Sequence, residues 1–492
     1  MSSQTLERLR AGDYVGVKKL KLSNDNLDSF PLEILSLHST LEILDLSNNP
    51  NLTSLPTSIS RLHNLKIAFF SDCSFKTFPS QLALCRSLEM VAFKNNGMTT
   101  IAEDSLPRKL RWLILTGNKI DELPRSIGEC ARLEKCMLAG NRLTSLPDEM
   151  RMCRKLGLLR LSCNRFERVP EWIWELPELA FFSCAGNPCL DVHSARSVKA
   201  NEEEVLRAEI TIKNDELENI PWRDLTVQHL LGKGASGIIS QGLWKRSSPR
   251  LPHTFQDSGY STPAVTASHE VAIKIFHGTL TSDGSPLDEL KSCIAVGAHE
   301  NVISSLGTIT SHPANERGLV LELIPKHYIN LGLPPNFDTC TRDNFAGDVK
   351  GKIDATKCMK ILRGIAEAAA HLHSRGVAHG DLYAHNILVD LEAGHAVLGD
   401  FGAATLYRNL CTIQDAISEE EARKVGGRYE KLEVLAFGHL VEDLVGCVDW
   451  NGEADEQILG TLTLLWRAST CPIVEKRIGF GNALEFLRRH EL

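Results

Sequence analysis

Three side chains that carry oxygen atoms lie close together in the stretch from His379 to Gly402, which contains HGDLYAHNILVD and then GDFG. Asp381 is followed by Asn386 and then by Asp400. A carboxylate can accept the proton of a hydroxyl group, and carboxylate or amide oxygens can hold magnesium against phosphate groups. Residues of these types at this spacing could therefore serve phosphoryl transfer, which depends mainly on positioning and charge.

The same stretch resembles the catalytic loop and the metal-binding loop of eukaryotic-type protein kinases, whose pattern is H-R-D-L-x-x-x-N followed by D-F-G. The resemblance implies that Asp381 accepts the proton of the substrate hydroxyl and that Asn386 and Asp400 bind the metal. It also implies ATP and Mg2+ as cofactors. An accidental match within another α/β domain is the alternative, and further kinase motifs upstream argue against it.

These upstream motifs occur in the order of the kinase family. The segment LLGKGASGII supplies the glycines of G-x-G-x-x-G, which let backbone amides approach phosphates. VAIK ends at Lys274, which the resemblance places on the phosphates and pairs with a helix-borne glutamate, for which Glu289 is the candidate; a surface strand lysine is the alternative. The expected nucleotide-binding residues are Leu231, Gly232, Gly234, Gly237, Ile239, Ala272, Lys274, Glu322, Ile324 and Leu388, and the expected catalytic residues are Asp381, Lys274, Glu289 and His385.

The catalytic loop departs from the family at two positions. Gly380 replaces the arginine that pairs with an activation-loop phosphate in the family, so we expect activity that needs no such phosphate. Tyr383 replaces the lysine that neutralises the transferring phosphoryl group, and a protonated His385 could supply part of that charge.

The family's A-P-E motif is missing after D-F-G. Glu433 aligns with an aspartate that begins a helix in the family and keeps its carboxylate. Arg477 resembles the arginine that pairs with the A-P-E glutamate, and Glu420 or Glu421 could serve as its partner here. An insert from Pro334 to Asp354 precedes the helical run that leads to the catalytic loop.

The first two hundred residues repeat a pattern at intervals of 22 to 24 residues, with starts at Leu41, Leu65, Leu88, Leu110, Leu133, Leu156 and Leu179 and a weaker copy at Val17. The pattern L-x-x-L-x-L-x-x-N resembles the leucine-rich repeat, in which short strands stack into a parallel sheet and the leucines form a continuous core. We expect Leu110, Leu113 and Leu115 to point inward and the recurring asparagines to bind backbone groups. Cys73 interrupts the asparagines, so a local irregularity is expected there.

The outward positions of these strands are unusually apolar for a surface in contact with water. One hypothesis is a protein-binding surface, because aromatic residues and methionine are favoured as binding anchors. The other is that the kinase half, the linker or the N-terminal segment folds onto this surface, and the sequence leaves both open. The residues that define the surface are Phe69, Met90, Trp112, Ile114, Met137 and Phe181.

Composition narrows the remaining possibilities. A net charge of -8 without long basic runs gives no electrostatic footprint for nucleic acid. The sequence contains neither a signal-peptide core nor an apolar run of about 20 residues, so no membrane span and a cytoplasmic location are expected. The 14 cysteines form no CxxC pair, and Cys85, Cys130 and Cys153 recur at one repeat position, which favours reduced, buried thiols over metal or redox sites.

The sequence thus predicts an α/β leucine-rich-repeat solenoid over residues 1–195, a linker or cap over 196–222, and an α+β bilobal protein kinase fold over 223–492, with lobes 223–324 and 325–492. The function expected from the resemblance is ATP-dependent phosphorylation of proteins, with a preference for Ser and Thr, and recognition of a substrate or regulator by the repeats. A pseudokinase scaffold that binds nucleotide with little phosphotransfer is the alternative, and the sequence does not define the oligomeric state.

Overall fold

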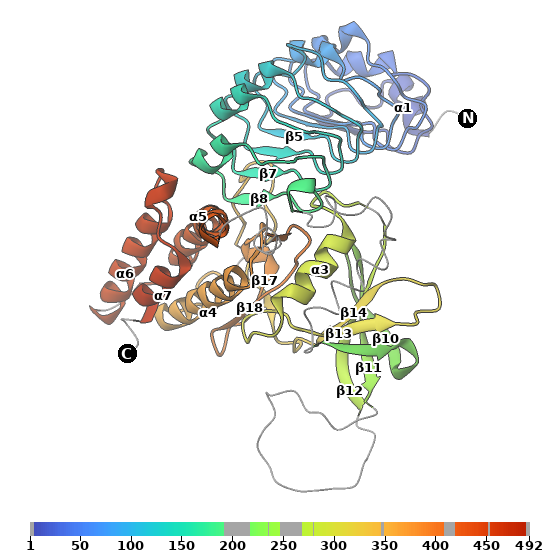
Figure 1. Ribbon diagram of the computed structural model, residues 1–492. Helices are drawn as coiled ribbons and strands as arrows, with labels where there is room; N and C mark the ends of the chain where they lie inside the picture. The colour runs from blue at the N-terminus through green and yellow to red at the C-terminus, as the bar shows by residue number, and fades with distance from the viewer. Residues whose placement is uncertain are drawn as a thin grey trace, which may run out of the picture.

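Figure 1 shows the computed structural model, which describes residues 4–190, 217–234, 236–246, 268–278, 280–345, 349–407, 419–450 and 453–488. Most of the expected linker, up to residue 216, lies outside the described residues. The chain begins in a curved solenoid and continues into two further lobes (Figure 1).

The solenoid contains eight parallel strands that pair in sequence order. Each strand occupies the third to fifth residues of a repeat, and Leu110, Leu113 and Leu115 are fully buried behind the sheet, as the pattern predicts. A helix precedes the strands, α1 (Gln4–Ala11), and the strands are β1 (Lys19–Lys21), β2 (Ile43–Asp45), β3 (Ile67–Phe69), β4 (Met90–Ala92), β5 (Trp112–Ile114), β6 (Lys135–Met137), β7 (Leu158–Arg160) and β8 (Phe181–Ser183).

Short 3-10 helices form the opposite side of the solenoid. Six of them follow directly on a proline, whose fixed φ suits the start of a helical turn. They are η1 (Leu32–Leu37), η2 (Thr57–Arg61), η3 (Ser80–Leu84), η4 (Arg125–Glu129), η5 (Asp148–Met152) and η6 (Glu171–Glu175), and η7 (Pro188–Leu190) is the last described element of this half.

A ladder of buried asparagines links successive repeats. Asn118 donates from Nδ2 to the carbonyls of Phe93 and Leu115, both at 2.8 Å, and accepts from two backbone N–H groups of the preceding repeat. Cys73 occupies the same repeat position, and its thiol contacts the carbonyl of Leu46 at 3.3 Å. The ladder therefore continues through Cys73 toward the preceding repeat, although a thiol has no equivalent of the second amide N–H.

The first lobe of the kinase half is built on a six-stranded sheet with the order β10-β11-β12-β14-β13-β9. The strands from β10 to β14 pair antiparallel, whereas β9 adds to β13 in parallel. The elements are β9 (Glu218–Pro221), η8 (Trp222–Asp224), β10 (Leu225–Lys233), β11 (Gly237–Lys245), β12 (Ser268–Phe276), α3 (Pro286–Val296), β13 (Ser305–Thr310) and β14 (Gly318–Glu322).

The second lobe is mainly helical. Its central helix α4 (Ala355–Ser374) begins at Asp354, whose carboxylate accepts from the N–H of Lys357 at 2.8 Å and so satisfies a free helix donor. The other helices are α5 (Glu419–Val445), η11 (Val474–Lys476), α6 (Glu453–Ser469) and α7 (Phe480–Arg488), and the short strands and turn that carry the loops are β15 (Ile329–Asn330), β16 (Val377–Ala378), η9 (Ala384–Asn386), β17 (Ile387–Asp390), β18 (His395–Leu398) and β19 (Thr405–Leu406). None of the helices in the described part of the chain combines the length and apolar character that a bilayer span requires.

The two predicted fold classes are both present, and they pack directly against each other. The C-terminal strands of the solenoid lie over the kinase half (Figure 1). Leu158, Ala180 and Phe181 of the repeats belong to the apolar core of the second lobe. Conversely, Tyr429 and Leu432 of α5 pack into the core of the solenoid. The apolar core is thus continuous across the boundary between the two halves.

Candidate active site

A buried ion pair fixes the first part of the site. Lys274 lies on β12 and contacts a carboxylate oxygen of Glu289 on α3, and both side chains are nearly inaccessible to water. Ser285 caps α3 by accepting from the N–H of Leu287 at 3.0 Å, and this fixes the helix that presents Glu289. Burial lowers the pKa of Lys274, but the negative charges of Glu289 and Asp400 outweigh it and leave the pKa raised. Lys274 therefore stays charged in the cleft.

The catalytic loop is held by a fully buried histidine. His379 Nε2 lies 2.9 Å from the carbonyl of Gly399, and its Nδ1 accepts from the N–H of Asp381 at 3.2 Å. The side-chain amide of Asn386 donates to both the carbonyl and a carboxylate oxygen of Asp381, each at 2.9 Å. These two hydrogen bonds use the amide N–H groups of Asn386. The amide oxygen is then the atom that can bind a metal.

Asp400 lies opposite this loop and is exposed. Its backbone φ of 56° is in the left-handed region, and one carboxylate oxygen accepts from the N–H of Gly402 at 3.1 Å. A Cβ built on Gly402 would lie 3.2 Å from that carboxylate and 3.9 Å from Glu289, so Asp400 is close to the Lys274–Glu289 pair. Asp381 and Asp400 both lie near His385, because the negative charge of each raises the pKa of that histidine. These residues therefore lie near one another.

The nucleotide end of the cleft begins at the turn between β10 and β11. Gly234 donates to the carbonyl of Gly237 at 2.9 Å, and a Cβ on Gly237 would collide with the carbonyl of Ile275 at 2.4 Å, so this position requires glycine. A Cβ on Gly232 would meet open space, which leaves the backbone accessible, and Leu231 is exposed beside it.

The residues expected around the adenine ring are apolar and partly buried. Ala272 shares an apolar cluster with Leu321 and with the half-buried Ile239, whereas Leu388 is half-buried on β17. The N–H of Glu322 is already used by the carbonyl of Ser304 at 3.0 Å. For Glu322 the prediction of nucleotide hydrogen bonds is therefore restricted to its carbonyl, while Ile324 is half-buried and remains a prediction.

The structure gives Gly380 a physical reason. Its φ is +73°, and a Cβ there would lie 2.7 Å from the carbonyl of Ala403 and 2.9 Å from the carbonyl of Phe182 in the repeats. The arginine of the family would therefore clash with the solenoid in this arrangement. The N–H of Gly380 donates to Glu433 at 2.7 Å, and Glu433 also contacts His373 at 2.8 Å. Glu433 thus fastens the loop to α5.

Tyr383 and His385 are both committed to neighbours. The ring of Tyr383 is buried and stacks on Phe181 of the repeats at 3.7 Å between centroids and 9° between planes. His385 Nδ1 lies 2.8 Å from Asp343. Burial lowers the pKa of His385. The negative charges of Asp343 and then of Asp381 raise this pKa by more, so the net shift is upward. His385 thus favours its protonated form.

Arg477 binds backbone carbonyls. Its guanidinium donates to the carbonyls of Cys471 at 2.9 Å, Lys431 at 3.0 Å and Pro177 at 2.6 Å. Burial lowers the pKa of Arg477 to about 10. One of these three backbone acceptors lies in the repeats. The side chain of Glu421 lies outside the described residues, and pairing of Arg477 with Glu420 or Glu421 stays a prediction.

The apolar outward surface of the repeats is partly covered by the kinase half itself. Trp112 packs near Phe337 at 6.4 Å between ring centroids and contacts Cys340, both in the insert from Pro334 to Asp354. Met137 packs on the core of the second lobe, and Phe181 covers Tyr383. Of the remaining residues, Met90 is buried and Phe69 and Ile114 are half-buried. Trp112, Met137 and Phe181 are therefore covered by the kinase half of the same chain, which was one of the two hypotheses for this surface.

Sequence reasoning missed Arg160, which lies in the middle of this contact. Its guanidinium contacts Asp381, donates to Asp283 at 2.9 Å and donates to the carbonyl of Gly380 at 2.8 Å. The available signal was its position in the repeat. The fifth position is apolar or small in the four repeats from Phe69 to Met137 and again at Ser183, and a fully charged residue there calls for a partner outside the solenoid.

Comparison with known proteins gives matches to both halves. Residues 225–443 match the family model of the protein tyrosine and serine/threonine kinases, and residues 40–62 match the leucine-rich repeat. The chain thus combines leucine-rich repeats with a protein kinase domain, and the candidate catalytic and nucleotide-binding residues described above lie within residues 225–443.

Three curated relatives illustrate the similarity. Fibroblast growth factor receptor 2 of Dugesia japonica is 29% identical over 230 residues, which are 42% of this chain and 23% of that protein. Cysteine-rich receptor-like protein kinase 10 of Arabidopsis thaliana is 29% identical over 195 residues, 36% of this chain and 26% of the relative. Protein flightless-1 homolog of Caenorhabditis elegans is 38% identical over 117 residues, 22% and 9% respectively. This chain therefore spans about a quarter or less of each of these relatives.

Proposed function

We propose that the chain is an ATP- and magnesium-dependent protein kinase that phosphorylates Ser or Thr hydroxyl groups and uses its repeats to recognise a substrate or regulator. The observation that supports the proposal is that the Lys274–Glu289 pair, Asp400 and the Asp381–Asn386 pair lie near one another. A lysine kept charged by a buried glutamate can hold phosphate oxygens, and a carboxylate fixed by a neighbouring amide can orient a hydroxyl.

The residues present also suit magnesium. Asp400 is exposed, and the amide oxygen of Asn386 is available once its N–H groups bind Asp381. In the described residues no three His, Cys, Asp or Glu side chains come together as a metal cage. Magnesium is typically held by one or two protein oxygens together with phosphates and water. When bound here, it would neutralise phosphate charge while Lys274 and Asp381 position the reacting groups.

Two further parts of the proposal rest on the sequence. The preference for Ser and Thr is carried over from the sequence, and His385, which stands where tyrosine-specific members of the family often carry arginine, could supply part of the charge that Tyr383 lacks. A cytoplasmic location has support from the cysteines of the described residues, which are buried or half-buried thiols, as expected in a reducing compartment.

The test measures transfer from radiolabelled ATP with magnesium to a pool of Ser, Thr and Tyr peptides. We expect incorporation to fall roughly 100-fold or more in Asp381→Asn, because a positioned proton acceptor contributes a factor of this order. Phosphoamino-acid analysis of the product then distinguishes Ser and Thr from Tyr. Equal incorporation by the wild type and Asp381→Asn would remove catalysis from the proposal.

Tyr383 favours a second candidate, the scaffold that binds nucleotide without transfer. The position that carries a cation in the family holds a buried ring, and removing a charge that stabilises the transferring phosphoryl group costs several kcal/mol in a dry site. This candidate predicts ATP binding with unchanged affinity in wild type and Asp381→Asn, and no incorporation by either.

A further inference from the structure

We propose that the repeats hold the kinase half in a state that excludes protein substrates. In this state the guanidinium of Arg160 contacts the carboxylate of Asp381 and blocks it. The inference rests on the proposed function and adds to it the regulation of the same site. The state is relieved when the repeat surface lifts from the catalytic loop.

The contacts of Arg160 occupy the position that a substrate hydroxyl needs. One carboxylate oxygen of Asp381 contacts the guanidinium of Arg160, and the other accepts from Asn386 at 2.9 Å. A hydroxyl that transfers its proton must approach that carboxylate within about 2.6–3.2 Å. Both oxygens are engaged, and only 20% of the Asp381 side chain is exposed. A substrate hydroxyl that approaches the oxygen facing Arg160 therefore has to displace its guanidinium.

The chemistry of Arg160 shows that this contact is specific. Its side chain is 1% exposed, and burial of a guanidinium is costly unless charges and hydrogen bonds compensate it. The compensation comes from Asp381, Asp283 and the carbonyl of Gly380, all in the kinase half. Asp283 belongs to the segment before α3, whereas Asp381 belongs to the catalytic loop, so one arginine ties the repeats to both lobes.

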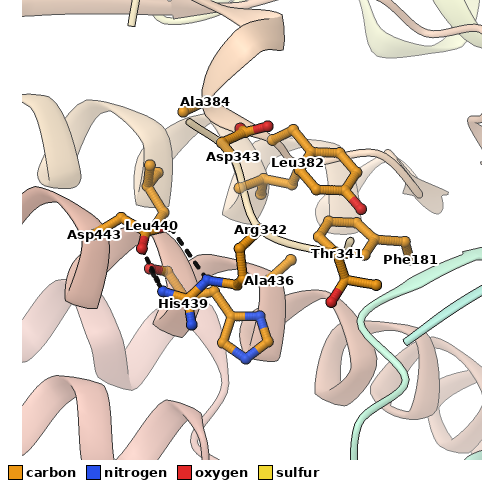
Figure 2. Close-up of a pocket in the computed structure, with 11 residues that line it drawn as sticks. Phe181, Thr341, Arg342, Asp343, Leu382, Ala384, Ala436, His439, Leu440 and Asp443 are labelled. Carbon is orange, nitrogen blue, oxygen red and sulfur yellow. Dashed lines mark hydrogen bonds and ion pairs between the residues drawn. The ribbon is translucent and has the colours of Figure 1, made fainter. Parts of the chain in front are cut away.

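The surroundings of Arg160 are closed to a peptide. Phe181 stacks on Tyr383, Lys135 lies over the same ring at 5.9 Å, and the carbonyl of Phe182 reaches the Gly380 backbone. A peptide laid along this part of the catalytic loop would have to displace these contacts. In Figure 2, Phe181 lies beside Thr341 of the insert, and the pocket drawn there has a volume of only about 10 Å³.

The nucleotide side of the cleft remains accessible in the same structure. Asp400 is exposed, a Cβ on Gly232 would meet open space, and the Lys274–Glu289 pair is formed. The state is therefore compatible with nucleotide binding and incompatible with protein substrate. Because the ion pair of the first lobe is intact, the block that the described residues show lies in access to Asp381.

The experiment compares full-length wild type, Arg160→Glu and Phe181→Asp. Arg160→Glu places a negative charge against Asp381 and Asp283, and Phe181→Asp removes the stack on Tyr383 without touching the leucine core of the repeats. The matched control is Arg165→Glu, which makes the same charge change at an exposed position of the same repeat. Three readouts are taken: affinity for a fluorescent ATP analogue, phosphate transfer to the peptide pool, and hydrogen exchange of residues 377–387.

We expect both interface variants to increase exchange in residues 377–387 and to raise phosphate transfer roughly tenfold or more over wild type and Arg165→Glu, as a closed state that loses its main contact would. Nucleotide affinity should stay within about twofold, because the nucleotide side is already accessible.

Three results would overturn the inference. If hydrogen exchange rises in the interface variants but their phosphate transfer equals that of an active wild type, the contact of Arg160 with Asp381 does not block the site. If transfer falls below wild type, Arg160 instead supplies the cation that Tyr383 does not. If exchange is unchanged in both variants, Arg160 and Phe181 do not hold the contact. A separate result, nucleotide binding and increased exchange with no transfer by any protein, would refute the proposed kinase activity together with its regulation.

Discussion

Lys274 and Glu289 have opposite charges in a place almost without water, so each depends on the other. Removing one partner of such a pair leaves an uncompensated buried charge and costs about 3–5 kcal/mol, whereas replacing both by apolar residues is often close to neutral. We expect Lys274→Met to lower the free energy of unfolding by about that amount and the double variant Lys274→Met with Glu289→Met to recover most of it. Urea unfolding of the wild type, of Lys274→Met and Glu289→Met, and of the double variant measures both effects.

The same set of variants separates stability from nucleotide binding. The double variant should fold well yet bind the ATP analogue weakly, because no cation remains for the phosphates. Additive losses in the double variant would mean that the two side chains do not compensate each other, and would contradict the pairing of β12 with α3.

His385 predicts a dependence of stability on pH. Its pKa is raised in the folded protein, where Asp343 and Asp381 outweigh burial, so the folded state holds the proton more tightly than the unfolded state. The resulting stabilisation is fully present below the pKa of an unfolded histidine, about 6.5, and is lost as the pH rises through the higher folded pKa. The difference in unfolding free energy between wild type and His385→Gln should therefore shrink from pH 6 upward, which a series of urea titrations would show. A difference that grows with pH would reverse the sign and refute a protonated His385.

At the level of single residues, the sequence was informative where chemistry restricts residue type. Asp381, Asn386, Asp400 and Lys274 stand in motifs whose spacing is set by the cleft, and the structure brings them together. Gly380 was recognisable only as a departure. Its φ of +73° and the carbonyls of Ala403 and Phe182 both restrict this position, and no local pattern indicates the contact with Phe182, which lies about two hundred residues earlier in the sequence.

The asparagine ladder determines how the repeats hold together as elements. Asn118 makes four hydrogen bonds to backbone groups that have no water nearby. Asn118→Ala would leave those groups unpaired, and each unsatisfied buried group costs about 1–3 kcal/mol. We expect a loss of several kcal/mol, measured by urea unfolding, with hydrogen exchange rising first in β4 and β5.

Cys73 offers the matched control for this prediction. Cys73→Asn would restore the second amide N–H at the equivalent position, where the thiol now contacts only carbonyls. A gain of about 1 kcal/mol is the expected size of one added hydrogen bond. If Asn118→Ala were tolerated with less than about 1 kcal/mol of loss, the ladder would be dispensable and the leucine core alone would hold the repeats.

At this scale the repeats were predictable because the same physical requirement recurs in every copy. Buried leucines, the asparagine corner and the proline before each 3-10 helix are local in sequence, so the period of the pattern gives the sheet. The insert from Pro334 to Asp354 has no such pattern, and its contact of Cys340 with Trp112 could be found only in three dimensions.

The contact between the two halves organises the whole molecule. The apolar outward positions of the repeats indicated that this surface is covered, but they did not identify what covers it. An apolar outward surface predicts burial against something, and one sequence does not distinguish a second protein from the rest of the same chain. The structure places the insert and the catalytic loop there, and a charged residue, Arg160, lies among the apolar residues of this surface. Docking of the two halves therefore follows from specific partners as well as from hydrophobic area.

Tyr429 on α5 tests whether this contact makes one cooperative unit. Its ring lies 5.1 Å from Trp174 and 5.8 Å from Phe182 of the repeats and stacks at 5.0 Å on Tyr407, while its hydroxyl lies 2.9 Å from the thiol of Cys184. Tyr429→Ala should cost about 3–5 kcal/mol, the usual range for a large aromatic side chain removed from a core. Because the ring belongs to both halves, hydrogen exchange should rise together in residues 171–190 and in α5.

Tyr429→Phe keeps the ring and should cost only about 1 kcal/mol for the lost hydroxyl contact. Loosening confined to α5, with residues 171–190 still protected, would show instead that the repeats fold independently of the kinase half and that the two merely touch.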